Sequence, residues 1–171
     1  MSRSTMYCVR QDGFVAPYLY LQNSNGTGPV VWTTLVERYG LRPLPGKWDP
    51  WETLFQVVED GSLKLEWWEH NTLWWTYDYA MLRREDFQAM ADSFRLFAER
   101  QKQDRISHGP EMAEALERML MFEPDILAAC IRVTDLSDNL WVSYNPETDE
   151  RDLFYNLHTG DKHQYIEVRR P

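Results

Sequence analysis

Tryptophan is concentrated in one short part of this chain, since six of its eight tryptophans lie between Trp48 and Trp75. Rings of this size must either be buried in a core or form a surface that binds something. Large aromatic side chains anchor protein interfaces, sugars and nucleobases alike. Any fold for this chain must therefore give the cluster a cover or a ligand, although the cluster does not identify that ligand.

Within this cluster, residues 62–69 and 73–79 alternate apolar and polar side chains around the turn-like residues 70–72. This period of two predicts two antiparallel strands that form a tryptophan-rich hairpin. A loop with an odd number of residues pairs Trp68 with Trp74 on the polar face and keeps the other apolar side chains on the opposite face. We expect these two indoles to be covered by another part of the chain, such as residues 41–48, or by a partner.

Further strands are expected at both ends of the chain. Residues 5–9 and 14–21 flank a Gln-Asp-Gly turn and predict an N-terminal hairpin, with Pro17 indicating an edge strand. A C-terminal β-meander is predicted from three further segments, with an additional candidate strand at 130–134. The three segments are 140–144, 152–157 and 163–168.

Helices are predicted between these groups of strands. Residues 83–104 and the segment that begins at Pro110 carry apolar side chains at helical spacing, and we expect them to form an antiparallel helical hairpin. Shorter helices are expected at 31–39, where Gly40 ends the pattern, and after Asp49 and Pro50, which are typical of a helix start. The predicted architecture is a single α+β domain over residues 1–171, in which an antiparallel β-sheet packs against the helical hairpin.

The net charge of −9 is unevenly distributed, because residues 109–161 carry 12 acidic and only 3 basic side chains. A negative field of this kind repels phosphate backbones and attracts basic surfaces. It argues against direct nucleic-acid binding and favours a basic protein partner. We also expect a cytoplasmic protein that does not bind membranes, because the sequence shows neither a membrane-spanning apolar run nor the apolar core of a signal peptide.

Catalytic and metal-binding motifs are not evident in the sequence. His158 and His163 lie near several carboxylates but lack a recognised ligand spacing, and we expect no metal ion or cofactor. The sequence contains no nucleophile elbow, zinc-protease motif or phosphate-binding loop. Cys8 and Cys130 share no short motif and are predicted to be buried, reduced thiols.

The function that these properties favour is protein binding. We expect a small acidic protein without catalytic activity that neutralises a basic partner, such as a toxin or nuclease, as an inhibitor or immunity (antitoxin-like) protein does. The alternatives are a small enzyme with a Glu- or His-containing aromatic pocket, and a module that binds carbohydrate or nucleobases. The expected partner-binding residues are Trp68, Trp74, Glu111, Glu114, Glu147, Asp149, Glu150 and Asp152.

Overall fold

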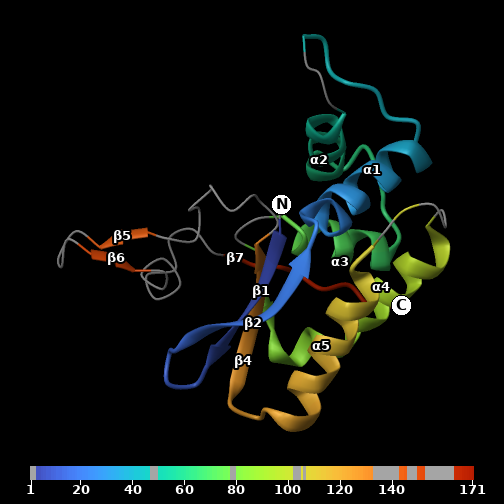
Figure 1. Ribbon diagram of the computed structural model, residues 1–171. Helices are drawn as coiled ribbons and strands as arrows, with labels where there is room; N and C mark the ends of the chain where they lie inside the picture. The colour runs from blue at the N-terminus through green and yellow to red at the C-terminus, as the bar shows by residue number, and fades with distance from the viewer. Residues whose placement is uncertain are drawn as a thin grey trace.

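The computed structural model describes residues 3–46, 50–77, 80–101, 105, 107–132, 143–145, 150–152 and 164–171. Its main element is a five-stranded sheet with the strand order β2-β1-β4-β3-β7 (Figure 1). The first four strands pair antiparallel, whereas β7 pairs parallel with β3. These strands are β1 Arg3–Arg10, β2 Val15–Gln22, β3 Ala80–Arg83, β4 Ile126–Arg132 and β7 Gln164–Tyr165. The chain therefore has the predicted α+β fold.

Within the described part of the chain, five α-helices surround one side and one end of this sheet. They are α1 Gly28–Arg38, α2 Trp51–Glu59, α3 Trp67–Trp75, α4 Phe87–Arg100 and α5 Gly109–Phe122, with short 3-10 turns at Ser24–Gly26 and Arg84–Asp86. Helices α4 and α5 lie side by side against the sheet, while α1, α2 and α3 gather at its upper end (Figure 1). Among the described helices, none combines the length and the apolar character needed to cross a bilayer.

The predicted helical hairpin is confirmed by its packing. Phe94 of α4 and Leu116 of α5 are fully buried and belong to the same core cluster as Met6 and Ile131 of the sheet. The stripes at helical spacing thus bury one face of each helix against one face of the sheet, as amphipathic helices do.

The predicted N-terminal hairpin is also confirmed. Strands β1 and β2 pair antiparallel, and Gly13 takes a positive φ of 82° in the turn between them. Pro17 lies on β2, the outermost strand of the sheet, opposite Tyr7 and next to an irregularity in the register. Proline has no N–H to donate to a neighbouring strand, so this edge position is where it costs least.

The tryptophan-rich hairpin, in contrast, was a wrong prediction. Residues Trp67–Trp75 form helix α3, which begins with a capping box between Glu66 and Glu69. Seven of its nine residues are buried, namely Trp68, Glu69, His70, Asn71, Thr72, Leu73 and Trp75. A helix that is buried on nearly all sides does not show the polar stripe of period 3.6 by which surface helices are recognised. The short alternation of apolar and polar residues was therefore mistaken for a strand.

The predicted C-terminal meander is only partly correct. Strands β5 Ser143–Asn145 and β6 Glu150–Asp152 pair antiparallel in a small sheet of their own, but β6 shares only Asp152 with the second predicted segment. The third segment does not continue that sheet, because β7 pairs with β3 of the main sheet. The rest of the predicted first two strands, and His163 at the start of the third, lie outside the described residues.

Two principal groups of buried apolar residues hold the structure together. One lies between the sheet and helices α4 and α5. The other joins α1, α2 and α3 through residues such as Leu35, Leu54 and Leu73, and it includes Phe97 of α4. Trp32 of α1 packs against both groups, so it links the core of the helical end to the core beneath the sheet.

Candidate functional site

The two tryptophans predicted to bind a partner occupy different environments. Trp68 is only 3% exposed and belongs to the core of the helical end. Trp74 is half-buried and contacts the rings of Phe55 and Tyr77. The exposed Trp68/Trp74 pair that the hairpin register implied is therefore not formed, since both residues lie on α3.

An aromatic surface does exist, but it is assembled from three separate segments. A hollow of about 420 Å³ is lined by residues of α1, α2 and the turn after α3, and we call it the aromatic hollow. Its lining residues are Trp32, Trp51, Glu52, Phe55, Gln56, Glu59 and Tyr77.

The rings of the aromatic hollow contact one another in edge-to-face or tilted arrangements. Trp32 lies 5.2 Å from Trp51 and 5.7 Å from Phe55 between ring centroids, and Phe55 lies 4.9 Å from Tyr77. The Trp32 indole N–H donates to Thr76 Oγ1 at 3.2 Å, and the Trp51 N–H donates to Thr33 Oγ1 at 3.3 Å. These hydrogen bonds fix the orientation of the two indoles, so the hollow is a preformed surface.

The aromatic hollow is accessible to solvent and negatively charged. Tyr77 is 49% exposed, whereas Trp32, Trp51 and Phe55 are half-buried. Glu52 and Glu59 are exposed on α2, and the part of the lining that the structure describes contains no lysine or arginine. The faces of aromatic rings carry partial negative charge, so rings and carboxylates together favour a cationic group.

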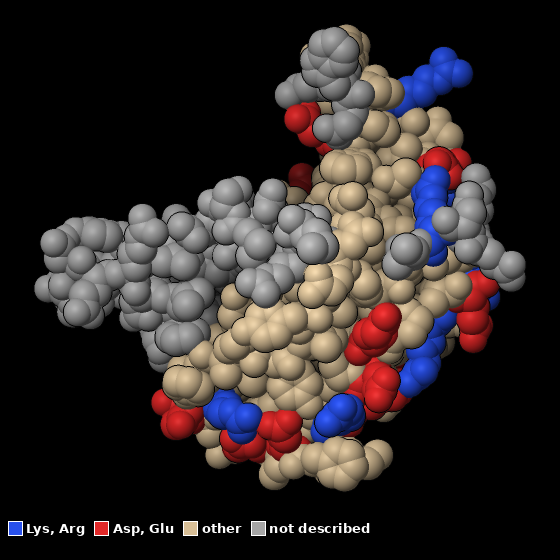
Figure 2. All heavy atoms as spheres, viewed as in Figure 1, with Lys and Arg blue, Asp and Glu red and all other residues tan. Residues whose placement is uncertain are grey.

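Two of the predicted acidic residues line a second hollow. Glu111 and Glu114 of α5 border a hollow of about 390 Å³ beside β2, which we call the acidic hollow; its other lining residues are Tyr18, Leu19, Ala115, Arg118 and Glu123. Figure 2 shows acidic and basic side chains gathered along the lower and right margins of the molecule, the side on which Figure 1 places α5.

Glu123 at the edge of the acidic hollow has an internal role as well. Arg10 Nη2 of β1 donates to Glu123 Oε2 at 2.7 Å, and its Nη1 donates to Asp125. Burial and the neighbouring Glu123 carboxylate raise the pKa of the Tyr18 phenol. Glu111 and Glu114 are exposed. Of the three carboxylates, these two are therefore the better placed to meet a partner.

The remaining predicted partner residues belong to the C-terminal third of the sequence. Glu150 and Asp152 lie on β6, and Glu147 and Asp149 lie outside the described residues, as do His158 and His163. Within the described residues, no group of three His, Cys, Asp or Glu side chains could hold a metal ion. Cys8 and Cys130 are buried free thiols, as predicted, and burial raises the pKa of both.

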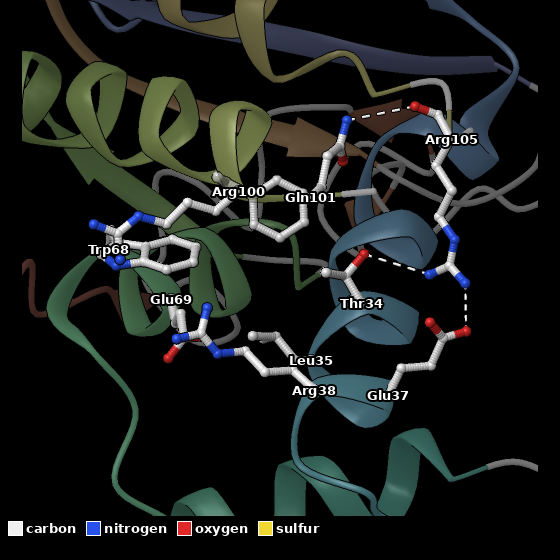
Figure 3. A pocket seen from close by; sticks show the side chains of 10 residues that line it. Thr34, Leu35, Glu37, Arg38, Trp68, Glu69, Arg100, Gln101 and Arg105 are labelled. Carbon is white, nitrogen blue, oxygen red and sulfur yellow. Dashed lines mark hydrogen bonds and ion pairs between the residues drawn. The ribbon is translucent and has the colours of Figure 1, made fainter. Parts of the chain in front are cut away.

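A third hollow, which the sequence did not indicate, surrounds Trp68. It has a volume of about 300 Å³ and lies between α1, α3 and the end of α4; we call it the arginine pocket (Figure 3). The residues that line it are Thr34, Leu35, Glu37, Arg38, Trp68, Glu69, Phe97, Arg100, Gln101 and Arg105.

Two arginines of this pocket stack on a single indole. The guanidinium carbons of Arg38 and Arg100 each lie 5.4 Å from the centre of the Trp68 ring. Figure 3 shows Trp68 between these two side chains, with Arg105 and Glu37 on the opposite side of the pocket. A position over tryptophan is favourable for each cation, and here two like charges share one ring.

Glu69 neutralises one of these arginines. Its side chain is fully buried, and Arg38 Nε lies 3.1 Å from Glu69 Oε1. The other oxygen, Oε2, accepts hydrogen bonds from the Tyr39 hydroxyl and from the Glu66 N–H. Burial, followed by the hydrogen bond to Glu69, raises the pKa of Tyr39, which therefore stays a neutral donor. The carboxylate thus fixes the position of Arg38.

Comparison with protein-family models, with curated proteins and with solved structures gave no match to this chain.

Proposed function

We propose that this chain is a protein-binding protein whose aromatic hollow receives a basic side chain of a protein partner. The observation that carries this proposal is the combination of accessible, oriented rings and carboxylates in one preformed hollow whose described lining residues include no lysine or arginine. In the proposed interface, the aromatic residues are Trp32, Trp51, Phe55 and Tyr77, and they replace the predicted Trp68.

The chemistry of the hollow suits an arginine or lysine of the partner. A guanidinium or ammonium over the ring faces gains a cation–π interaction of about 0.5–2 kcal/mol, depending on how far it is desolvated. Glu59 can pair with the same cation or with its neighbours. Aromatic anchors slow dissociation, whereas the acidic character of the whole chain accelerates association with a basic surface.

The biological role that fits these properties is neutralisation of a basic toxin or nuclease by an inhibitor or immunity protein acting in the cytoplasm. Tight and fast capture is what such a role requires, and charge complementarity with aromatic anchors provides both. The proposal assigns no catalytic step to this chain.

Affinity capture from the native host with the full chain as bait tests this proposal. We expect the wild-type chain to retain a basic protein in stoichiometric amount, and the double variant Tyr77→Ala, Glu59→Lys to lose at least 90% of it. Loss of one anchor and reversal of one charge together remove about 2–4 kcal/mol from an interface, which accounts for this loss. Titration of the purified partner's activity with this chain then distinguishes inhibition from simple binding.

A matched control carries the same two kinds of change elsewhere. The variant Tyr20→Ala, Glu85→Lys alters an exposed tyrosine on β2 and an exposed glutamate before α4, and it should retain the partner. Equal capture by both variants, or retention of an acidic protein, would contradict the proposal. A sugar or nucleotide retained at the aromatic hollow would instead favour the small-ligand alternative.

A further inference from the structure

We infer that the arginine pocket binds a small molecule through an oxyanion, a phosphate or carboxylate group, held by Arg38 and Arg100. This site is separate from the aromatic hollow, and the two share no lining residue. The inference therefore does not depend on the proposed protein partner.

The first observation is an excess of positive charge in an otherwise acidic protein. Among the described residues, the lining includes three guanidinium groups, of Arg38, Arg100 and Arg105, and two carboxylates. Arg38 pairs with Glu69, and Arg105 pairs with Glu37. Arg100 forms no ion pair with another described residue, so its charge is left for a ligand or for solvent.

The second observation is that two cations share one indole. Both guanidinium carbons lie 5.4 Å from the centre of the Trp68 ring, so they are at most twice that distance apart. The charge of Arg100 is not offset by a described carboxylate. An anion that enters the pocket would be attracted to both groups, and arginines are the usual partners of phosphate and carboxylate groups.

The third observation is preorganisation. Arg38 contacts Glu69 through Nε, and its two terminal NH₂ groups make no hydrogen bond to another described residue. Glu69 is itself held by Tyr39 and by the backbone of Glu66. The fork of Arg38 is therefore positioned with its donors available, so less conformational entropy is lost when an anion binds.

The size of the pocket sets the class of ligand. A volume of about 300 Å³ is at the lower limit for small-molecule sites and larger than one inorganic anion needs. The Trp68 face is occupied by arginines and the residue is buried, so an aromatic base has no ring on which to stack. A compact phosphate ester or carboxylic acid fits these constraints better than a nucleotide.

Binding can be measured with defined probes on the full chain. We would titrate inorganic phosphate, ribose 5-phosphate and citrate, each against chloride at matched ionic strength, and follow the Trp68 indole signal in proton–nitrogen correlation spectra. We expect saturable binding of at least one probe. Preference for ribose 5-phosphate would identify the ligand as a phosphate ester, and preference for citrate would identify a carboxylate.

The deciding variant is Arg100→Gln, because Arg100 is exposed and its replacement leaves the buried Glu69 paired with Arg38. It should weaken binding at least tenfold, and Arg100→Lys should weaken it severalfold because the charge remains but the planar fork is lost. Arg95→Gln is the matched control, since Arg95 is an exposed arginine of the same helix that pairs with Glu117 outside the pocket. Absence of saturable binding by all three probes, or equal weakening by Arg95→Gln, would overturn the inference.

Discussion

His70 is the residue whose environment most clearly predicts a pH effect. It is buried on α3, and its Nδ1 has no hydrogen-bond partner among the described residues. Burial lowers its pKa below 6.5, the positive charge of Arg169 lowers it further, and Asn71 and Glu167 offset part of this shift. His70 therefore binds a proton less tightly in the folded state than in the unfolded chain.

The free energy of unfolding depends on pH because His70 binds protons with different affinity in the folded and unfolded states. Above pH 6.5 His70 is neutral in both states and the free energy of unfolding is unaffected by it. As the pH falls below this value, the unfolded state binds more protons, so stability decreases until the folded pKa is passed. The slope due to one histidine cannot exceed about 1.4 kcal/mol per pH unit.

Urea unfolding at pH 7.5, 6.5 and 5.5 checks this prediction. We expect the wild-type chain to lose stability over this range and His70→Gln to lose distinctly less, whatever its stability at pH 7.5. Because the other titrating groups are common to both proteins, the difference in slope isolates His70. Parallel pH profiles would show that His70 does not resist protonation in the folded state.

At the scale of elements, Arg84 ties the end of one helix to the start of a strand. Its guanidinium donates to the carbonyl oxygens of Met119, Leu120 and Glu123 at the end of α5, and to that of Ile126 in β4, at 2.9–3.2 Å. The last carbonyls of a helix have no partner within the helix and carry partial negative charge, so a cation there is doubly favourable.

Replacing this cation should have a large effect. We expect Arg84→Met to lower the free energy of unfolding by about 2–3 kcal/mol, because half-buried carbonyl groups would lose a charged donor while the aliphatic packing is kept. Arg83→Met is the matched control, since the neighbouring Arg83 is exposed and contacts the ring of Tyr165; it should cost less than about 1 kcal/mol. Chemical denaturation measures both, and equal losses would argue against the helix-end role of Arg84.

Some of the helices and strands could be predicted from the sequence, and others could not. The stripe on α4 and α5 and the turn between β1 and β2 are local signals, and the sheet and helical hairpin they predicted were found. Helix α3 gave a misleading signal, because neighbours along the whole helix bury polar residues such as Asn71 and Thr72 with its apolar ones. Strand β7 is paired with β3, more than 80 residues earlier, and no local pattern encodes that pairing.

The candidate sites could be predicted even less well. Trp51 and Phe55 pack against the core of the helical end, but they also line the aromatic hollow together with Trp32 and Tyr77. The arginine pocket likewise combines Arg38, Trp68 and Arg100, which are distant in sequence. Such surfaces arise only when α1, α2, α3 and α4 are packed. The composition therefore predicted an aromatic and acidic binding surface, but it could not predict which residues form these hollows.

At the scale of the whole molecule, the C-terminal segment joins the sheet to the helices. The Ile166 N–H donates to Met81 O of β3, and Ile166 and Val168 pack against the core beneath the sheet. Beyond them, Asn71 of α3 holds the backbone of Arg169 by two hydrogen bonds of 2.9 Å, one from its amide nitrogen and one to its amide oxygen. The Asn71 nitrogen also donates to Ser93 Oγ of α4.

Asn71 is therefore the point at which α3, α4 and the C-terminal segment meet, and it is completely buried. Replacing it with alanine leaves the Arg169 N–H and carbonyl, together with Ser93, without these partners. We expect Asn71→Ala to lower the free energy of unfolding by about 2–4 kcal/mol, since each unsatisfied buried group costs about 1–3 kcal/mol and water relieves part of that cost.

Arg170 is the matched control for Asn71, because its ion pair with Asp86 holds the same C-terminal segment from the protein surface. Its guanidinium is largely exposed, so Arg170→Ala should cost less than about 1 kcal/mol. Amide hydrogen exchange adds a local readout: Asn71→Ala should accelerate exchange at Ile166 and Arg169, whereas Arg170→Ala should not. If the two variants lost the same stability and protection, the segment would be held by its surface contacts, and the buried amide of Asn71 would not be what joins the sheet to the helices.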